Sequence, residues 1–239
     1  MQLLDLTLPT PEENLALDEA LLEAAERGAI ADEVLRLWEP QAPFIVLGRS
    51  SQVALEVDQQ ACRSRGIPIL RRSSGGATVV TGAGCLMYAV VLDLDRQPHL
   101  RAIDEIHAFV LGKLCSDLNS LIPGISRQGT SDLALENRKF SGNSLRVKRN
   151  HALYHGTLLY DFPLLLVAEL LSAPPRQPEY RQGRPHDEFV RNVPISGDAL
   201  RHALGATFAA TVPLPDWPEA AVAALVAEKY SLPSWNLRH

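Results

Sequence analysis

The chain reads RRSSGGATVV at residues 71–80, and this stretch says most about how the molecule folds. Arg71 and Arg72 come first, two adjacent glycines follow, and β-branched residues end the stretch. Glycine lets backbone N–H groups approach a ligand closely, and arginine supplies positive charge in a rigid fork. The stretch therefore predicts a strand that leads into an anion-binding loop, although a glycine hairpin with incidental arginines is the simpler alternative.

A second stretch repeats this chemistry further along the chain. Residues 137–144 read NRKFSGNS, and HGTLL follows at residues 155–159. Here too, cationic side chains stand next to glycine between apolar residues that are typical of strands. Two stretches of this kind predict a site for an anion such as phosphate or an adenylate.

Length, composition and charge narrow the class of protein. The 239 residues suit one large domain, or one domain with a small appendage. Hydrophobic residues make up 46% of the chain and charged residues 21%, as in globular soluble proteins. The net charge of −5 argues against nucleic-acid binding, which needs a basic face. One basic run, Arg146 to Arg149, is either a solvated hairpin tip or a contact for an acidic partner.

The cysteines and the apolar runs bear on the compartment. Cys62, Cys85 and Cys115 are widely spaced and form no CxxC pair, which favours neither a disulfide framework nor a zinc site. No cationic N-terminal region followed by a long apolar run is present, so no signal peptide is expected. The apolar run Leu86–Leu92 is too short to span a membrane. We expect a cytoplasmic protein with no membrane partner.

Periodicity and turn residues predict an α+β domain with a mixed, largely antiparallel sheet and packed helices. Thr10, Pro11 and Glu13 have the spacing of a capped helix N-terminus, and Gly28 is a suitable stop. The run Leu86–Leu92 suits a strand buried on both faces. Further strands are expected at Val34–Trp38, Phe44–Leu47, Gly66–Arg72, Asp132–Glu136, Lys139–Val147 and Ala152–Tyr160. Further helices are expected at Asp58–Arg65, Ile103–Leu121, Pro163–Leu171, Gly197–Ala210 and Trp217–Lys229, with a long loop or lid at Ala173–Pro185.

Five motifs occur in a recognisable order. NLALDE at residues 14–19, LRLWEP at 35–40 and VLGRSSQ at 46–52 stand with the two glycine stretches. Together they resemble the catalytic domain of lipoate–protein ligases, a family that includes octanoyltransferases and, more distantly, biotin–protein ligases. The resemblance runs from about Asn14 to Asn192. It implies the fold of the biotin/lipoate protein ligase catalytic domain.

The resemblance implies an ATP-dependent reaction. Lipoate or octanoate would be activated as acyl-AMP with ATP and Mg²⁺, and the acyl group would pass to a lysine of an apo lipoyl carrier domain. Such carriers are the E2 subunit of a 2-oxoacid dehydrogenase, a glycine-cleavage H-like protein or another lipoate-binding protein. The carboxylate and the α-phosphate are both anionic, so their reaction needs a nearby cation. In the family that cation is the lysine of the second stretch, here Lys139. The simpler alternative is that Lys139 is a solvent-facing lysine on a strand.

Other family positions imply binding roles. Ser73 would donate to an oxygen, and Asp132 would hold Mg²⁺ or the nucleotide, or else cap a turn. His155 would orient rather than transfer protons, and Arg49 would belong to the rim of the pocket. The expected substrate- and nucleotide-binding residues are Arg49, Arg71, Arg72, Ser73, Gly75, Gly76, Ala77, Thr78, Val79, Asp132, Ser141, Gly142, Asn143, His155, Gly156 and Thr157.

Three features depart from the family pattern. Many relatives carry His-Asp and then Gly-Asn where this chain has Thr81–Cys85, so a nucleotide contact made by that histidine is missing. Ala77 replaces a third glycine. The tail Lys229–Asn236 is similar to a short element of longer ligases or of their separate subunits, and the chain ends before an accessory domain. We expect a catalytic domain over 1–195, a helical extension of it over 196–239, and either a compact ligase or a subunit that needs an accessory partner.

Cysteine placement favours a ligase over an octanoyltransferase. The transferases carry the acyl chain on a thiolate, at positions where this chain has Ala152 or Gly129–Ser131. Cys115 is expected in the core, and Cys85, the cysteine nearest to the first loop, on a buried strand. The alternatives are an octanoyl or lipoyl transferase that works without ATP, a biotin–protein ligase, and a non-catalytic relative that binds lipoyl domains or nucleotide.

Overall fold

Two β-sheets with helices packed on them form the computed structural model, which describes residues 1–239. The large sheet has the strand order β11-β1-β2-β6-β10-β9-β8-β7, and its pairs are antiparallel except those that β1 makes with β2 and β11. The α+β class with a mixed, largely antiparallel sheet is confirmed. The strands are β1 (Gln2–Asp5), β2 (Val34–Trp38), β6 (Cys85–Asp93), β7 (Ile125–Gln128), β8 (Asp132–Leu135), β9 (Arg138–Val147), β10 (His151–Leu159) and β11 (Val212–Pro213).

The small sheet carries the first glycine stretch. Its order is β4 (Ile69–Arg71), β3 (Phe44–Leu47) and β5 (Val79–Thr81), with β3 parallel to β4 and antiparallel to β5. Residues 72–78 connect the two outer strands. The stretch RRSSGGATVV therefore leaves one edge of this sheet and returns at the other.

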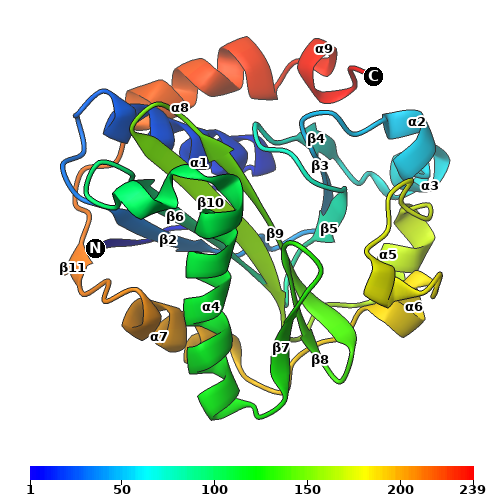
Figure 1. Ribbon diagram of the computed structural model, residues 1–239. Helices are drawn as coiled ribbons and strands as arrows, with labels where there is room; N and C mark the ends of the chain where they lie inside the picture. The colour runs from blue at the N-terminus through cyan, green and yellow to red at the C-terminus, as the bar shows by residue number, and fades with distance from the viewer.

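Helices cover both faces of the large sheet (Figure 1). The alternation of β6 shows which residues each layer buries: Tyr88 and Val90 belong to the core under α4 and α7, whereas Ala89 and Val91 belong to the core under α1. Leu86–Leu92 reads as a continuous apolar run because both faces of β6 are covered. The helices are α1 (Pro11–Glu26), α2 (Val53–Glu56), α3 (Gln59–Arg65), α4 (Ile103–Leu121), α5 (Leu165–Leu170), α6 (His186–Phe189), α7 (Gly197–Thr207), α8 (Glu219–Leu225) and α9 (Pro233–Asn236).

Local signals placed the longer elements well. Thr10 caps α1 with a complete capping box, and α4, β2 and β3 have the bounds expected from sequence. The helix expected at Trp217–Lys229 begins two residues later, at Glu219, and after Leu225 it continues as a π-helical turn. The short elements β1, β5, β7, β11, α2, α6 and α9 were not expected, because so few residues show no periodicity.

The basic run at Arg146–Arg149 lies at the tip of the β9–β10 hairpin and is engaged within the molecule. Arg146 lies 2.5 Å from Glu19, and Lys148 lies 2.6 Å from Glu23, both on α1. Neither expectation for this run, a solvated tip or a contact for an acidic partner, accounts for these ion pairs.

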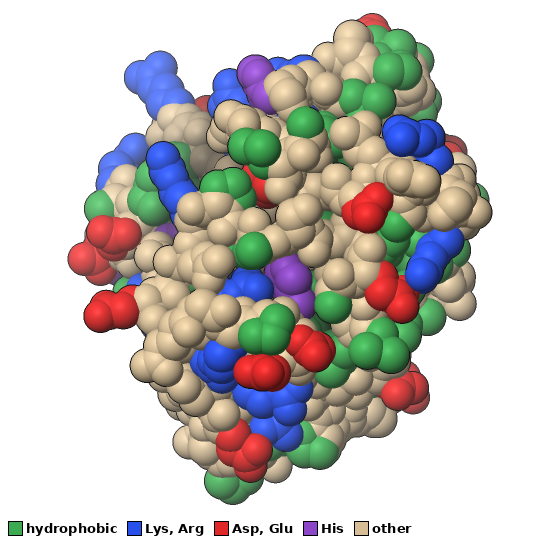
Figure 2. Space-filling model, turned by 90° about the vertical axis from the view of Figure 1, so that its right-hand side faces the viewer, with side chains coloured by type: hydrophobic (Ala, Val, Ile, Leu, Met, Phe, Trp, Pro, Cys, Tyr) green, Lys and Arg blue, Asp and Glu red, His purple; other side chains and the backbone are tan.

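Elsewhere, basic and acidic side chains lie near each other on the face seen in Figure 2. None of the helices combines the length and the hydropathy needed to cross a membrane.

Candidate active site

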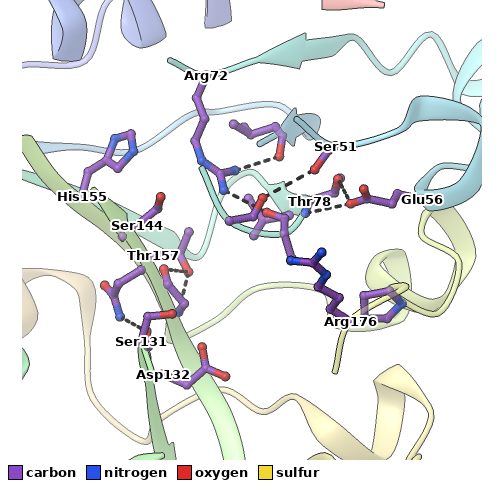
Figure 3. Close-up of a pocket in the computed structure, with 18 of the residues that line it drawn as sticks. Ser51, Glu56, Arg72, Thr78, Ser131, Asp132, Ser144, His155, Thr157 and Arg176 are labelled. Carbon is purple, nitrogen blue, oxygen red and sulfur yellow. Dashed lines mark hydrogen bonds between the residues drawn. The ribbon is translucent and has the colours of Figure 1, made fainter. Parts of the chain in front are cut away.

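A cavity of about 790 Å³ lies where the two sheets meet (Figure 3). Its wall includes Asp18 of α1, Val46 of β3, the segments 50–56 and 174–178, and residues of β8, β9 and β10. Only six of its 29 lining residues are hydrophobic, so the cavity suits a charged ligand. A smaller cavity of about 120 Å³ shares part of this wall. Nine of its 21 lining residues are hydrophobic, among them Phe140, Leu159, Val167, Leu171 and Phe189, and charged residues such as Arg176 and Arg181 line it as well.

Arg72 organises the first glycine loop from inside. Its guanidinium donates to the carbonyl of Gly75, to that of Ala77 at 3.0 Å and to that of Val46 at 3.2 Å. Gly76 has a φ of +84°, and a Cβ there would lie 2.9 Å from Arg72 Nη2. A Cβ on Gly48 would lie 1.9 Å from the Gly76 carbonyl oxygen. Gly76 is therefore required by its positive φ and by the Arg72 side chain, and Gly48 by the close approach of loop 48–51 to the glycine loop.

The glycine loop is positively charged without a paired carboxylate. Arg71 and Arg72 are both buried, and neither takes part in a salt bridge. Burial lowers the pKa of Arg72 to about 10, and the charge of Glu56 acts in the opposite direction. Arg72 remains protonated at neutral pH, so its charge favours an anion in the cavity.

Lys139, which lines both cavities, forms an ion pair with Asp132, which lines the large one. Lys139 Nζ lies 2.7 Å from Asp132 Oδ1, and the Lys139 side chain is 25% exposed. The hydroxyl of Tyr180, in the loop before α6, donates to Asp132 Oδ2 at 2.8 Å. A Cβ on Gly142 would lie 2.8 Å from Lys139 Nζ, so glycine at 142 leaves the room that the lysine side chain occupies.

Asn143 crosses over Gly156 on the neighbouring strand. Its Oδ1 accepts from the Tyr88 hydroxyl at 2.5 Å, and its Nδ2 donates to the Ser131 carbonyl at 2.8 Å. A Cβ on Gly156 would lie 1.8 Å from that Oδ1. Asn143 thus holds Ser131 in place, and Asp132 follows it as the first residue of β8. Thr157 Oγ1 accepts from the Gly142 N–H at 3.3 Å.

His155 joins α1 to the glycine loop. Its Nδ1 lies 3.0 Å from Asp18 Oδ2, and its Nε2 lies 2.5 Å from Ser74 Oγ. Burial alone would raise the pKa of Asp18, but the charge of Arg36 at 2.5 Å and the hydrogen bond from His155 lower it, so Asp18 is ionised. Nδ1 therefore donates to Asp18, and Nε2 shares a hydrogen bond with the Ser74 hydroxyl, which also accepts from Arg72. Both ring nitrogens therefore have hydrogen-bond partners, and the orienting role stays a prediction.

The structure brings most of the expected site residues together. Arg72, Gly76, Ala77, Thr78, Val79, Asp132, Lys139, Gly142, Asn143, His155, Gly156 and Thr157 line the large cavity, and Ser141 lines the small one. Gly75 lies behind the wall, where its carbonyl accepts from Arg72 and from Ser144 Oγ. Their chemical roles remain predictions.

Three expected residues are placed elsewhere. At the end of β4 the side chains of Arg72 and Ser74 face the loop and His155, whereas those of Arg71 and Ser73 face the C-terminal residues. Arg71 binds backbone carbonyls, and Ser73 contacts the Tyr230 hydroxyl. Arg49 is exposed and does not line the cavity. Direct ligand contact by Arg71, Ser73 or Arg49 is therefore not supported.

Some lining residues had no assigned role in the sequence. Glu56 accepts from the Thr78 hydroxyl at 2.6 Å and from the Gln52 N–H at 3.0 Å, which ties α2 to the glycine loop. A four-residue helix leaves no periodic signal. Asp18 did have a signal, since it is an acid within the apolar run of α1, in the motif NLALDE. Segment 174–178 lines both cavities within the expected long loop.

No cysteine lines either cavity. Cys85 is fully buried on β6, where burial raises its pKa to about 12. Burial likewise raises the pKa of Cys62, and Cys115 packs against the core beneath α4. A cysteine thiolate in the cavity is therefore absent at neutral pH.

The order of these residues along the chain matches a known family. The model for the lipoyl protein ligase A/B catalytic domain matches residues 10–200. The chain belongs to this family. It is 34% identical over 152 residues to a putative lipoate-protein ligase A from Aeropyrum pernix, covering 63% of this chain and 54% of that protein. It is 25% identical over 266 residues to octanoyltransferase LipM from Brevibacillus brevis, covering 96% and 95%. The chain spans about half the length of its ligase relatives from Aeropyrum and Mycoplasma.

Solved structures share the fold. A bi-partite lipoate protein ligase from Thermoplasma acidophilum, studied with its E2 lipoyl domain, superposes with a TM-score of 0.83 at 22% identity, over 100% of this chain and 97% of that one. A lipoate-protein ligase A bound with ATP superposes with a TM-score of 0.82 at 23% identity, over 99% and 98%. The expected ligase-type catalytic-domain fold is confirmed.

Proposed function

We propose that this family member is an ATP-dependent lipoate–protein ligase. It activates lipoate, or octanoate, as acyl-AMP and then transfers the acyl group to a lysine of an apo lipoyl carrier domain. The observation that carries the proposal is the position of Lys139 in the shared wall of two cavities, of which the smaller has the larger share of hydrophobic lining residues. The charge of Arg72 in the glycine loop supports it, because acyl-AMP formation brings anionic groups together.

The two cavities suit the two parts of an adenylate. In the smaller cavity of about 120 Å³, the apolar side chains of Phe140 and Leu159 and those of Val79 and Val80 of β5 suit the face of a flat base. Strand β5 pairs only with β3, so its outer edge presents backbone donors and acceptors to such a base. The larger cavity then holds the phosphate near Arg72 and Lys139, and the acyl group against its apolar side chains, such as Leu15 and Val46.

The proposed chemistry has two balanced steps. In the first, a carboxylate oxygen of the acid attacks the α-phosphorus of ATP, the bond to the β-phosphate oxygen breaks, and pyrophosphate leaves. The ammonium of Lys139 stabilises the added negative charge. In the second, the acceptor amine attacks the acyl carbon, the bond to AMP breaks, and the amine loses a proton. That proton passes to solvent.

Mg²⁺ is usually held by one or two carboxylates together with substrate phosphates. Asp132 fits as one such ligand, since its two oxygens face Lys139 and Tyr180 at the cavity wall. No cluster of three or more metal-binding side chains is present, so phosphate and water would complete the coordination. When bound, the ion would neutralise charge on the phosphates.

A transferase that works without ATP is the second candidate. The match to LipM over nearly the whole of both chains favours it. The cysteines argue against it: none lines a cavity, and the nearest, Cys85, is buried with a raised pKa. An acyl-thioester intermediate would have no nucleophile here.

Partners and domain organisation are part of the proposal. The Thermoplasma relative is a bi-partite ligase, and a curated relative is named lipoate-protein ligase A subunit 1, so we include an accessory subunit among the possible partners. We also propose that residues 196–239 extend the catalytic domain of 1–195. In support, α7 packs with α4, and β11 pairs with β1 of the large sheet.

The test compares two acyl donors on one acceptor. The protein is incubated with an apo lipoyl domain and either lipoate with Mg-ATP or an octanoyl carrier protein without ATP, and the mass of the domain is measured. The ligase predicts a lipoyl mass gain that needs ATP. Acyl transfer from the carrier protein without ATP would establish the transferase instead. Cys85→Ala serves as the matched control, since it removes the thiol nearest to the glycine loop.

A further inference from the structure

Arg71 lies at the centre of a backbone network outside both cavities. It is fully buried, and its guanidinium donates to carbonyls on two sides. On one side are Gly48 at 2.7 Å and Ser51 at 2.8 Å. On the other are Trp235 at 3.2 Å and Arg238 at 2.5 Å. A lysine ammonium has three donors on one atom and could not bind the carbonyls on both sides. The planar guanidinium of arginine has five donors and binds carbonyls on each side.

The C-terminal segment, residues 230–239, also covers the free edge of β4. Asn236 Oδ1 accepts from the Arg71 N–H at 3.0 Å, and the Trp235 indole donates to the Arg71 carbonyl at 2.8 Å. These side chains take the place of a neighbouring strand, because β4 pairs only with β3. Trp235 is itself held between two cations, with Lys229 at 4.1 Å and Arg238 at 3.8 Å from its ring. Figure 1 shows α9 beside the small sheet.

Loop 48–51, which Arg71 binds, also contacts the glycine loop. The Arg49 N–H donates to the Ser74 carbonyl at 2.8 Å, and Gly48 packs against the Gly76 carbonyl. Ser51 lines the cavity and is bonded through its carbonyl to Arg71. A continuous set of contacts therefore runs from the C-terminal segment through Arg71 and loop 48–51 to the glycine loop.

We propose that Arg71 is a positioning residue through which the C-terminal segment holds the glycine loop in its anion-binding shape. The proposal rests on the proposed function, because it assigns nucleotide affinity to a residue that touches no ligand. The Arg71 guanidinium donates its hydrogen bonds to backbone carbonyls. Its neighbour Arg72 donates to carbonyls of the glycine loop, which lines both cavities. Loosening Arg71 should weaken the binding of ATP more than it slows the chemical step.

The experiment uses the full chain with Arg71→Lys, which keeps the charge but not the fork, and Trp235→Phe, which removes the indole donor and leaves a smaller aromatic ring. Acid-dependent pyrophosphate exchange measures KM and kcat for Mg-ATP. We expect Arg71→Lys to raise the KM for Mg-ATP about tenfold, with kcat and the KM for the acid within about twofold, and Trp235→Phe to have a smaller effect in the same direction. Arg96→Lys, an exposed change paired with Asp32, is the control.

Hydrogen–deuterium exchange provides a readout that does not depend on activity. The Arg49 N–H donates to the Ser74 carbonyl and the Arg72 N–H donates to the Leu47 carbonyl, both at the glycine-loop end of this network, and both amides should exchange faster in both variants. Unchanged exchange, or a fall in kcat with no change in the KM for Mg-ATP, would overturn the proposal. If the wild-type protein forms no acyl-AMP, the proposed function fails, and faster exchange would still establish the positioning role. If Arg71→Lys does not fold, the same two measurements on Trp235→Phe test the proposal.

Discussion

Replacing Lys139 by methionine tests the proposed chemistry most directly. Methionine keeps most of the length of the side chain and removes the charge in the wall between the two cavities. A unit charge about 4 Å from a developing anion is worth about 4 kcal/mol at an effective dielectric constant of about 20. That energy corresponds to about a thousandfold in rate. Because the lysine side chain is 25% exposed, water screens part of this, and we expect adenylation to fall about a hundredfold to a thousandfold.

The same substitution should cost little stability. The ion pair with Asp132 is partly exposed, and Asp132 keeps its hydrogen bond from Tyr180, so the loss should be about 1 kcal/mol or less. Acid-dependent pyrophosphate exchange measures adenylation, and a urea melt measures stability. Lys113→Met is the matched control, since Lys113 is an exposed lysine on α4 and lines neither cavity. Retention of adenylation within about tenfold of wild type by the Lys139 variant would refute the role given to this charge.

Three further predictions concern the surroundings of the site. Gly156→Ala should destabilise the protein by about 2–4 kcal/mol in urea melts, because its Cβ would lie 1.8 Å from Asn143 Oδ1; a loss under about 0.5 kcal/mol would contradict the packing. Cys85→Ala should keep acyl transfer within about twofold and cost about 1 kcal/mol of stability, whereas loss of transfer would indicate thiol chemistry. Because the folded-state pKa of Asp18 is lowered, with burial outweighed by the charge of Arg36, its stabilisation is present above its ordinary pKa of 3.8 and is lost as the pH falls below it. Urea melts from pH 7 to pH 3 should show this loss, and Asp18→Asn should reduce it.

Secondary structure was predictable where several local signals agree. Thr10 and Glu13 cap α1, a 3.6-residue period marks α4, and an unbroken apolar run marks β6. Such signals depend on neighbours in the sequence, so they can be recognised without knowledge of the fold. The two-residue β11 and the four-residue α2 have no such signal, because tertiary contacts alone stabilise them.

The sequence predicted which residues lie at the site better than it predicted what each side chain contacts. The two glycine stretches were expected to form one site, and Gly76, Lys139 and His155 do line one cavity. Glu56 was missed, because the loop to which its carboxylate binds lies more than twenty residues away in the sequence. Arg71 was misplaced for a different reason: two adjacent arginines look alike in a sequence, although they point in opposite directions on a strand.

By itself, the sequence determined the class of fold, the order of its long elements and the two cationic glycine loops, because these depend on residue type and local spacing. Only the tertiary structure decided which side of each loop meets the cavity. Arg72 faces it and Arg71 faces the C-terminal segment, since the sheet edge at β4 is completed by Trp235 and Asn236 from the other end of the chain. Alternation along a strand follows from covalent geometry, but which face is buried against what depends on contacts between distant residues.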